Sequence, residues 1–442
     1  MNLIKFGEKY FDEVEISTYR KKEIRAEIEL NQISMSYISR KTKTVIRGIS
    51  DKRLGIYVVD GDGEEKIKDG IEKAYKMARM NRRDERWISL PQKQSYGKRT
   101  EINEGLKEQE PEFFVNILLD STKRILREDP NAVVAGGESG SEWVESMVMN
   151  SHAVEVSQEN VAAYFYLYLV GKKGNQVTPG IFDMDVRRDA NLDTDYIVSS
   201  LLSKLKKAYN VVPSKDGEST VILEPFALSE LIEYTLLPSL KGDRKVKGTS
   251  YLQDKLGERV LNESINLMDD PWHPLGVERI IADDEGVASR RTEIFRKGKL
   301  ESFLWDNYWG KIEGVGSTGN GYRDLKTGGI NIAPHNLVLE PGHQKVEDII
   351  SGIKEGYFVS LLQGAHSSNP DTGDFSVVAN PAFKIENGEI VGSTVFMLSG
   401  NIISLLNRVE ELSSEQRRVY ALGRGIFPYV KFYDVKIASV SK

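Results

Sequence analysis

Two acidic clusters and five histidines are the residues of this chain whose types could support metal or hydrolytic chemistry. The acidic clusters are Asp269-Asp270-Pro271 and Asp283-Asp284-Glu285-Gly286, whose carboxylates could bind a hard cation. Turns favour the same residue types for local reasons, so a turn is the preferred interpretation of both clusters. No two histidines are four or five residues apart, as a helical pair of zinc ligands would be. The histidines are His152, His273, His335, His343 and His366.

Other chemical motifs are missing or incomplete. The chain has no cysteine, which excludes disulfides, thiolate metal ligands, iron–sulfur clusters and a thiol nucleophile. Gly314–Gly319 has the glycine spacing of a dinucleotide-binding fingerprint, but turn residues follow where the fingerprint requires a helix, so a glycine loop is preferred. The sequence contains neither a Walker loop nor a G-x-S-x-G elbow. The residue types and spacings alone therefore define no catalytic site.

Bulk composition limits the class of protein. The 442 residues include 60 Lys and Arg against 66 Asp and Glu, a net charge of −6, which argues against a dedicated nucleic-acid binder. The basic run Arg79–Arg86 is diluted by acidic neighbours, so a solvated loop is favoured over a nucleic-acid patch. No apolar run has the length of a signal peptide or of a membrane span. We therefore expect a cytoplasmic protein.

The N-terminal half is predicted to mix strands with a few helices. Alternating apolar and polar residues over 24–60 predict strands, and apolar stripes predict helices over 67–78 and 111–129. Further strands are expected between 131 and 190. The last of them, 161–170, alternates core residues with tyrosines, and this tyrosine face could line a groove or an interface. Its tyrosines are Tyr164, Tyr166 and Tyr168.

A polar, turn-rich segment at 213–217 follows a predicted helix over 195–208 and serves as the domain boundary. We expect an N-terminal α/β domain, 1–212, with a mainly antiparallel sheet, and a β-rich C-terminal domain, 213–442. In the C-terminal domain the pattern predicts a strand at 219–223. It predicts helices at 227–237, 346–354 and 405–422, within a long region of strands and turns. Because strands and helices are segregated rather than alternating, the fold class is α+β.

Several segments together resemble the PmbA/TldD family, also called modulators of DNA gyrase. The longest is Gly364–Ser376, and shorter ones include Gly248–Gly257, Asp283–Val287 and Ile385–Ile390. Asn150–Ala153 resembles the family's Asn-Ser-x-Gly turn, with alanine in place of the usual glycine. From the longest segment we expect structural, cavity-facing residues that are candidates for a groove. They are Gly364, His366, Asn369, Pro370, Thr372, Gly373, Asp374 and Phe375.

The family pairs two kinds of subunit, and the resemblance implies which kind this chain is. TldD subunits are metalloproteases with an H-E-x-x-x-H helix and a cysteine as a further metal ligand. Here the corresponding positions hold Glu233, Tyr234 and Pro238. Proline cannot ligate a metal, tyrosine is a poor general base near neutral pH, and no cysteine exists. The chain therefore resembles the PmbA/TldE type, with no catalytic residue and no metal ligand of its own.

The resemblance implies a subunit of a TldD/TldE-type metalloprotease complex that cleaves unfolded peptides. Zinc is expected in the TldD-type partner and no cofactor in this chain. We expect a heterodimer with that partner, or a homodimer when the chain is alone. Aromatic residues of the C-terminal domain are candidates for the interface. They are Trp272, Trp305, Tyr308 and Trp309.

Two alternatives remain open. The first is a stand-alone peptide-binding or regulatory protein of the gyrase-modulator type, without peptidase activity. The second, weaker alternative is an independent hydrolase that uses the acidic clusters or His366. An adjacent gene that encodes H-E-x-x-x-H in the same fold would favour the subunit hypothesis over both.

Overall fold

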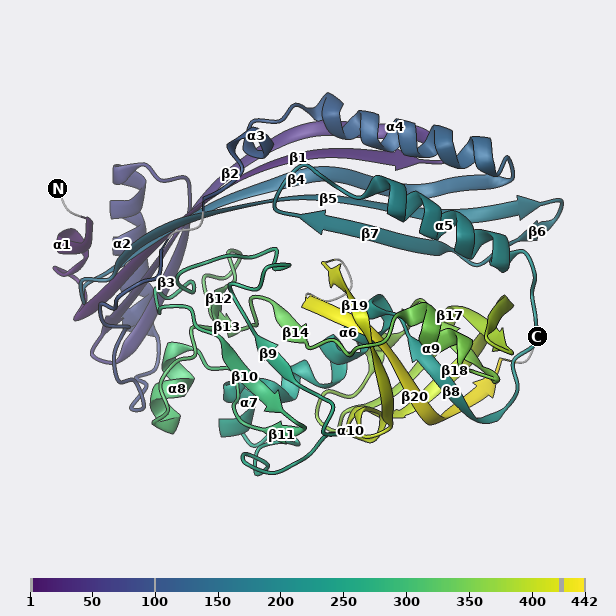
Figure 1. The fold of residues 1–442 in the computed structure, drawn as a ribbon. Coiled ribbons are helices and arrows are strands. Elements are labelled where there is room, and N and C mark those ends of the chain that lie inside the picture. Colours follow the sequence, from purple (N-terminus) through teal and green to yellow (C-terminus); the bar gives the residue numbers. More distant parts are fainter. Residues whose placement is uncertain (1–2, 99–100, 421–424, 441–442) are drawn as a thin grey trace.

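The structure is a computed structural model that describes residues 3–98, 101–420 and 425–440. A long, curved N-terminal sheet lies over a strand-rich C-terminal half (Figure 1). This arrangement confirms the predicted α+β class and the predicted mainly antiparallel N-terminal sheet. Within the described ranges, no helix is long and apolar enough to cross a membrane.

Seven strands form the N-terminal sheet in the order β3-β2-β1-β4-β5-β6, with β7 also paired to β5, and every pair is antiparallel. The strands are β1 (Glu13–Glu29), β2 (Gln32–Ser50), β3 (Arg53–Asp60), β4 (Ala132–Asn150), β5 (Glu155–Lys173), β6 (Gln176–Val177) and β7 (Ile181–Arg187). The helices of this half are α1 (Leu3–Gly7), α2 (Glu64–Met80), α3 (Glu104–Lys107), α4 (Pro111–Glu128) and α5 (Thr194–Ala208). The helices predicted at 67–78, 111–129 and 195–208 are confirmed.

Two-residue turns with positive φ join the first three strands. Leu30 and Asn31 lie at φ 47° and 68°, and Asp51 and Lys52 at 51° and 57°, the combination that a type I′ hairpin requires. The turn between β4 and β5 places Ala153 at φ 61°. That left-handed conformation suits glycine, which explains why the family-like turn usually ends in one.

The two faces of the N-terminal sheet have different partners. Helices α4 and α5 cover one face (Figure 1), where Phe165, Leu167 and Leu169 of β5 are fully buried. The opposite face looks toward the C-terminal half, and Tyr164 and Tyr166 pack against the core of that half. The predicted alternation of β5 is therefore confirmed, and its tyrosine face contributes to an interface within the chain.

Eleven strands form the C-terminal sheet, with β11-β10-β9-β14-β20-β18-β17-β15-β8 as its main order, and β12 and β13 form a separate pair. The strands are β8 (Gly217–Leu223), β9 (Leu267–Asp269), β10 (Thr292–Arg296), β11 (Lys299–Leu300), β12 (Gly321–Arg323), β13 (Ile330–Ile332), β14 (Leu337–Leu339), β15 (Glu355–Val359), β16 (Leu362–Gln363), β17 (Asp374–Glu386), β18 (Glu389–Asn401), β19 (Val409–Val419) and β20 (Gly425–Ser439). The helices are α6 (Pro225–Thr235), η1 (Leu237–Leu240), α7 (Gly242–Val246), α8 (Asn307–Glu313), α9 (Val346–Ser351), η2 (Ala365–Ser367) and α10 (Ile402–Leu406).

The predicted helix over 405–422 is wrong. Residues 402–406 form the short helix α10, residues 409–419 form strand β19, and positions 421 and 422 lie outside the described residues. The apolar residues from Ile402 to Leu412 recur at helical spacing, but β19 pairs antiparallel with β20 instead. This pairing buries Val409 and Leu412, so a long-range contact decides the structure.

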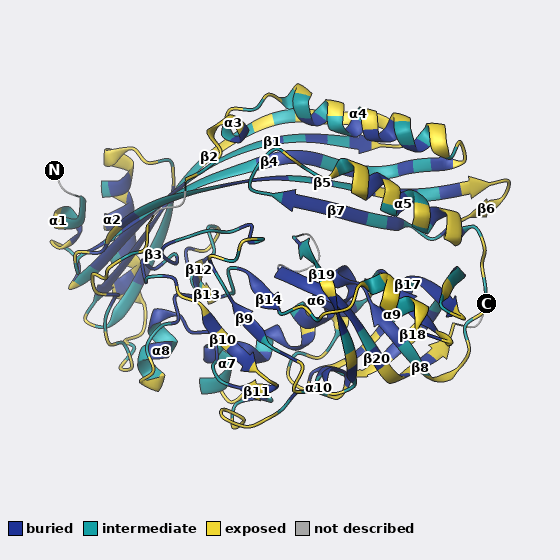
Figure 2. Ribbon diagram, in the orientation of Figure 1, coloured by how far each residue is buried: buried dark blue, intermediate teal, exposed yellow. Residues whose placement is uncertain are grey.

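Buried residues follow the strands and the inward sides of the helices, whereas exposed residues mark the outer sides of α2, α4 and α5 (Figure 2). One hydrophobic cluster contains residues of both halves, including Leu167 and Leu201 from the first and Phe358, Phe383 and Tyr429 from the second. The two halves therefore share part of their core.

Candidate functional site

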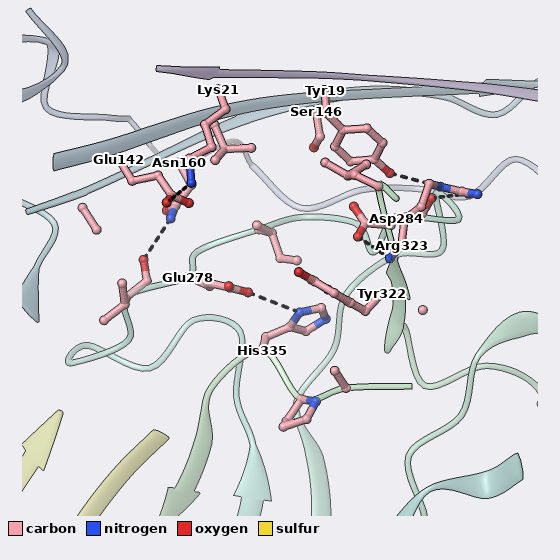
Figure 3. A pocket seen from close by; sticks show the side chains of 18 of the residues that line it. Tyr19, Lys21, Glu142, Ser146, Asn160, Glu278, Asp284, Tyr322, Arg323 and His335 are labelled. Atoms are coloured by element: carbon pink, nitrogen blue, oxygen red, sulfur yellow. Dashed lines mark hydrogen bonds and ion pairs between the residues drawn. The ribbon is translucent and has the colours of Figure 1, made fainter. Parts of the chain in front are cut away.

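A cavity of about 990 Å³ lies between the inward face of the N-terminal sheet and loops of the C-terminal half. Lys21, Glu142 and Asn160 reach into it from the sheet, and Glu278, Tyr322 and His335 face them from below (Figure 3). A second hollow of about 650 Å³ is lined by Tyr234, Lys241, Tyr322 and Ala333, which also line the first. The two hollows therefore meet at these four residues.

The positions that replace the metal motif face this junction. Glu233 and Tyr234, at the end of α6, line the first cavity, and Tyr234 and Pro238 line the second hollow. Pro238 lies in η1 rather than in α6. Among the described residues, no group of three or more His, Cys, Asp or Glu side chains is arranged to hold a metal ion. That this chain binds no metal in solution stays a prediction.

The family-like segment Gly364–Ser376 contributes only two of its predicted residues to the second hollow. His366 and Pro370 line it, and the His366 ring meets the Tyr234 ring edge-on, with centroids 6.4 Å apart. Gly364 and Gly373 have φ of 89° and 78°, so both serve left-handed turns.

The remaining predicted groove residues of this segment support the loop. The Asn369 side chain accepts a hydrogen bond from the Asp371 backbone N–H at 2.9 Å. Thr372 Oγ1 donates to Asp374 at 2.6 Å, and Asn401 holds Asp374 at 2.9 Å. Phe375 is buried in the core. These four residues position the groove wall rather than line it.

Only part of the turn interpretation of the acidic clusters holds. Asp283 does close a turn, because its Oδ1 accepts from the backbone N–H groups of Glu285 and Val287. However, the side chains of Asp283 and Glu285 are buried, which sequence reasoning missed. Asp269 is not in a turn: it ends strand β9, is fully buried, and accepts a hydrogen bond from Asn320 Nδ2 at 2.6 Å.

Four buried charges join the two halves of the chain. Arg47 of β2 contacts Glu15 of β1 and Glu285, each at 2.8 Å. Arg323 of β12 pairs with Glu15 and donates to the Asp284 carbonyl at 2.9 Å. Two cations thus balance two anions in a network, here called the front network, beside the large cavity. Its members lie up to 308 residues apart in sequence, so no local spacing reveals it.

A second set of buried charges, the rear network, also joins the two halves. Asp183 of β7 contacts Arg417 of β19 at 2.7 Å and Lys204 of α5 at 3.6 Å. Lys204 Nζ lies 2.6 Å from Glu224, the residue that precedes α6. Breaking such a pair leaves an uncompensated buried charge, so both networks fix the orientation of the halves around the cavity.

His335 is the histidine that the structure places deepest in the large cavity wall. Its Nε2 lies 2.6 Å from the Gly319 carbonyl. Its Nδ1 lies 3.9 Å from Glu278, a contact that Figure 3 shows. Burial by itself would lower the pKa of His335, but the charges of Asp269 and Glu278 outweigh burial and raise it. The raised pKa means that the His335 ring takes up a proton more readily than a free imidazole does.

Glu230 gives a prediction for pH-dependent stability. It lies on α6, one turn before Glu233, and burial raises its pKa to about 7. Because the folded pKa exceeds the unfolded one, ionisation of Glu230 destabilises the fold as pH rises from about 4.5 to about 7. Glu230→Gln should raise the free energy of unfolding by about 1–3 kcal/mol at pH 8, with a difference that shrinks toward zero near pH 4.5.

Chemical denaturation of both proteins at several pH values measures this difference. Glu233→Gln on the same helix is the matched control, because Glu233 lies at the cavity rather than in the core. A Glu230→Gln effect that does not change between pH 4.5 and pH 8 would contradict the assignment.

Two features of the fold place the chain in a known class of protein. A curved antiparallel sheet closes over a β-rich half, and helix α6 ends at the cavity between them. The family model described as "PmbA/TldA metallopeptidase C-terminal domain" matches residues 216–439, and the chain belongs to the PmbA/TldD family. The chain is similar to the solved structure of TldE from Thermococcus kodakarensis, with 51% identity, 99% of each chain covered and a TM-score of 0.97.

Two further similarities are more distant. A zinc metalloprotease TldD homolog of Saccharolobus solfataricus is 27% identical over 84% of this chain and 82% of that protein. A structure from Thermotoga maritima, described as a candidate modulator of a DNA gyrase, is 20% identical, covers 98% of this chain and 99% of that one, and has a TM-score of 0.87. The latter shows the same fold.

Proposed function

We propose that this chain is the non-catalytic, TldE-type subunit of a metalloprotease complex whose zinc belongs to a TldD-type partner. The observation that carries the proposal is the place of Glu233, Tyr234 and Pro238. They stand where the resemblance puts the metal motif, and all three line the joined hollows. In the part of the chain that the structure describes, no three His, Asp or Glu side chains are arranged to hold a metal ion there.

The role of this chain is then to form a wall of a chamber for unfolded peptides. Lysines, carboxylates and tyrosines line its cavity, together with apolar side chains. An extended peptide can satisfy its backbone groups on polar walls and strand edges without a defined sequence, which selects unfolded chains. The proposal includes a cytoplasmic location and assembly as a heterodimer, or as a homodimer in the absence of the partner.

The interface of that dimer is expected in the C-terminal half. Trp305 is buried in the chain's own core, and Tyr308 and Trp309 of α8 are partly buried. Trp272 is 43% exposed and is therefore the best candidate among the four aromatic residues for contact with a partner.

The metal part of the proposal predicts the zinc content of the purified chain. After incubation with equimolar zinc and desalting, the chain should retain far less than one zinc ion, because Glu233, Tyr234 and Pro238 supply no metal-binding set. Elemental analysis measures the ratio, with a TldD-type subunit as the positive control. One tightly held transition metal per chain would contradict the proposal.

A further inference from the structure

Lys241 places a cationic side chain at the junction of the two hollows. It lines both of them and is half-buried. Within residues 3–98, 101–420 and 425–440, its Nζ makes neither an ion pair nor a side-chain hydrogen bond. Burial lowers the pKa of Lys241, and Glu233 and Asp243 offset only part of that effect from beyond contact distance. A desolvated ammonium without a partner is costly, and such groups are enriched at functional sites.

The other charges of the second hollow are already compensated. Arg244 pairs with Asp371, and Lys247 contacts Asp243 at 2.8 Å. Burial and the neighbouring Glu285 raise the pKa of Asp306 to about 8, so its carboxyl is mostly neutral at pH 7. Among the lysines and arginine that line the second hollow, Lys241 is thus the one without an ion pair in the described part of the chain.

The surroundings of Lys241 match one chemical class of ligand. Apolar surface from Pro238, Trp309 and Ile332 lines the second hollow, which can hold a side chain next to a bound anion. Glu233 and Asp243 are the acidic neighbours that act on Lys241, and they would repel a polyanion, such as a phosphorylated or nucleic-acid ligand, more than a single carboxylate. A single carboxylate on an otherwise neutral or apolar chain fits this balance.

We propose that Lys241 is a carboxylate-binding site that takes one end of a peptide, with the adjacent side chain in the second hollow. This proposal rests on the proposed role of the cavity as a peptide chamber. The carboxylate can come from the C-terminus of the peptide or from an acidic side chain, and both have the same chemistry. In either case Lys241 holds the carboxylate at the junction, where Tyr234 also lies.

Peptide binding tests the site. Three fluorescent peptides of one unstructured sequence ending in leucine are compared by anisotropy: one with a free C-terminus, one amidated, and one amidated with an internal glutamate. The free C-terminus should bind about tenfold or more tightly than the amide, as expected for a charge-assisted hydrogen bond. Recovery of that affinity by the internal glutamate would assign the site to any carboxylate, and no recovery to the C-terminus alone.

Variants locate the effect at Lys241. Lys241→Met should abolish the difference between free and amidated peptides, and Lys241→Arg should retain most of it. Lys247→Met is the matched control from the same hollow, because the Lys247 charge is already paired, and it should keep the preference. Unchanged thermal unfolding of each variant confirms that the fold is intact.

Equal binding of free and amidated peptides, or no binding of any peptide to the chain, would overturn the site. A preference that survives in Lys241→Met would also overturn it. Light scattering with a TldD-type partner is measured separately, so that failure of the complex to form is distinguished from failure of this site.

Discussion

Replacing Arg323 by methionine is expected to lower the free energy of unfolding by about 3–5 kcal/mol. Arg323 is almost fully buried and joins the two halves of the chain through Glu15 and the Asp284 carbonyl. Methionine fills much of the same volume but leaves the Glu15 carboxylate with Arg47 as its one remaining ion-pair partner among the described residues. Urea unfolding, followed by circular dichroism, measures the loss.

Two controls distinguish the stability effect of the front network from that of surface ion pairs. Lys68→Ala removes the two ion pairs that Lys68 makes with the exposed Glu64 and Glu65 of α2, and it should leave the unfolding midpoint nearly unchanged. Adding Glu15→Gln to Arg323→Met should cost less than the sum of the two single changes, because the double variant no longer buries an unbalanced charge. A loss below about 1 kcal/mol for Arg323→Met would show that the network does not hold the halves together.

Separating the halves at the predicted boundary is expected to abolish cooperative folding of the C-terminal fragment, 213–442. This fragment would expose Phe358, Phe383 and Tyr429, which share a hydrophobic cluster with residues of the N-terminal half. It would also leave Glu224 and Arg417 without the partners that they have in the rear network. The fragment should bind the dye ANS and lack a sharp thermal transition.

Co-expression with residues 1–212 provides the control for this experiment. The two fragments together should recover a sharp transition, because the shared core and both networks re-form. A fragment 213–442 that unfolds cooperatively on its own and binds no ANS would show that the boundary separates independent domains.

Local patterns predicted the elements of the N-terminal half well. The alternation of Phe165, Leu167 and Leu169 with tyrosines depends only on the two-residue period of a strand. In the structure, the Phe and Leu face packs against helices and the tyrosine face packs against the C-terminal half. The helix predicted over 405–422 failed because its spacing is ambiguous over a short apolar run. There the pairing of β19 with β20, which is a contact between distant segments, decided the structure.

The residues of the candidate site also fall into two groups, those that the sequence located and those that it missed. A resemblance of motifs located Glu233, Tyr234, Pro238, His366 and Pro370, and the structure brings all five to the joined hollows. Lys241, His335 and the front network were missed. The place of Lys241 at the junction depends on how distant segments pack around the two hollows. His335 and the front network depend on partners from other elements: the acids beside His335 are 57 and 66 positions away in sequence, and Arg323 reaches Glu15 across 308. The turn interpretation was right for Asp270 and Asp283. The burial of Asp269, Asp283 and Glu285 was missed, because a local sequence does not show which distant segments cover it.

The subunit hypothesis is tested most directly by a peptidase assay on an unfolded, fluorogenic peptide. The chain is measured with zinc alone, with a TldD-type partner plus zinc, and with that partner after its H-E-x-x-x-H glutamate is changed to glutamine. The proposed function predicts no cleavage by the chain alone, cleavage by the zinc-loaded complex, and none by the complex with the altered partner. Cleavage by this chain without a partner, or failure to form a complex in light scattering, would contradict it.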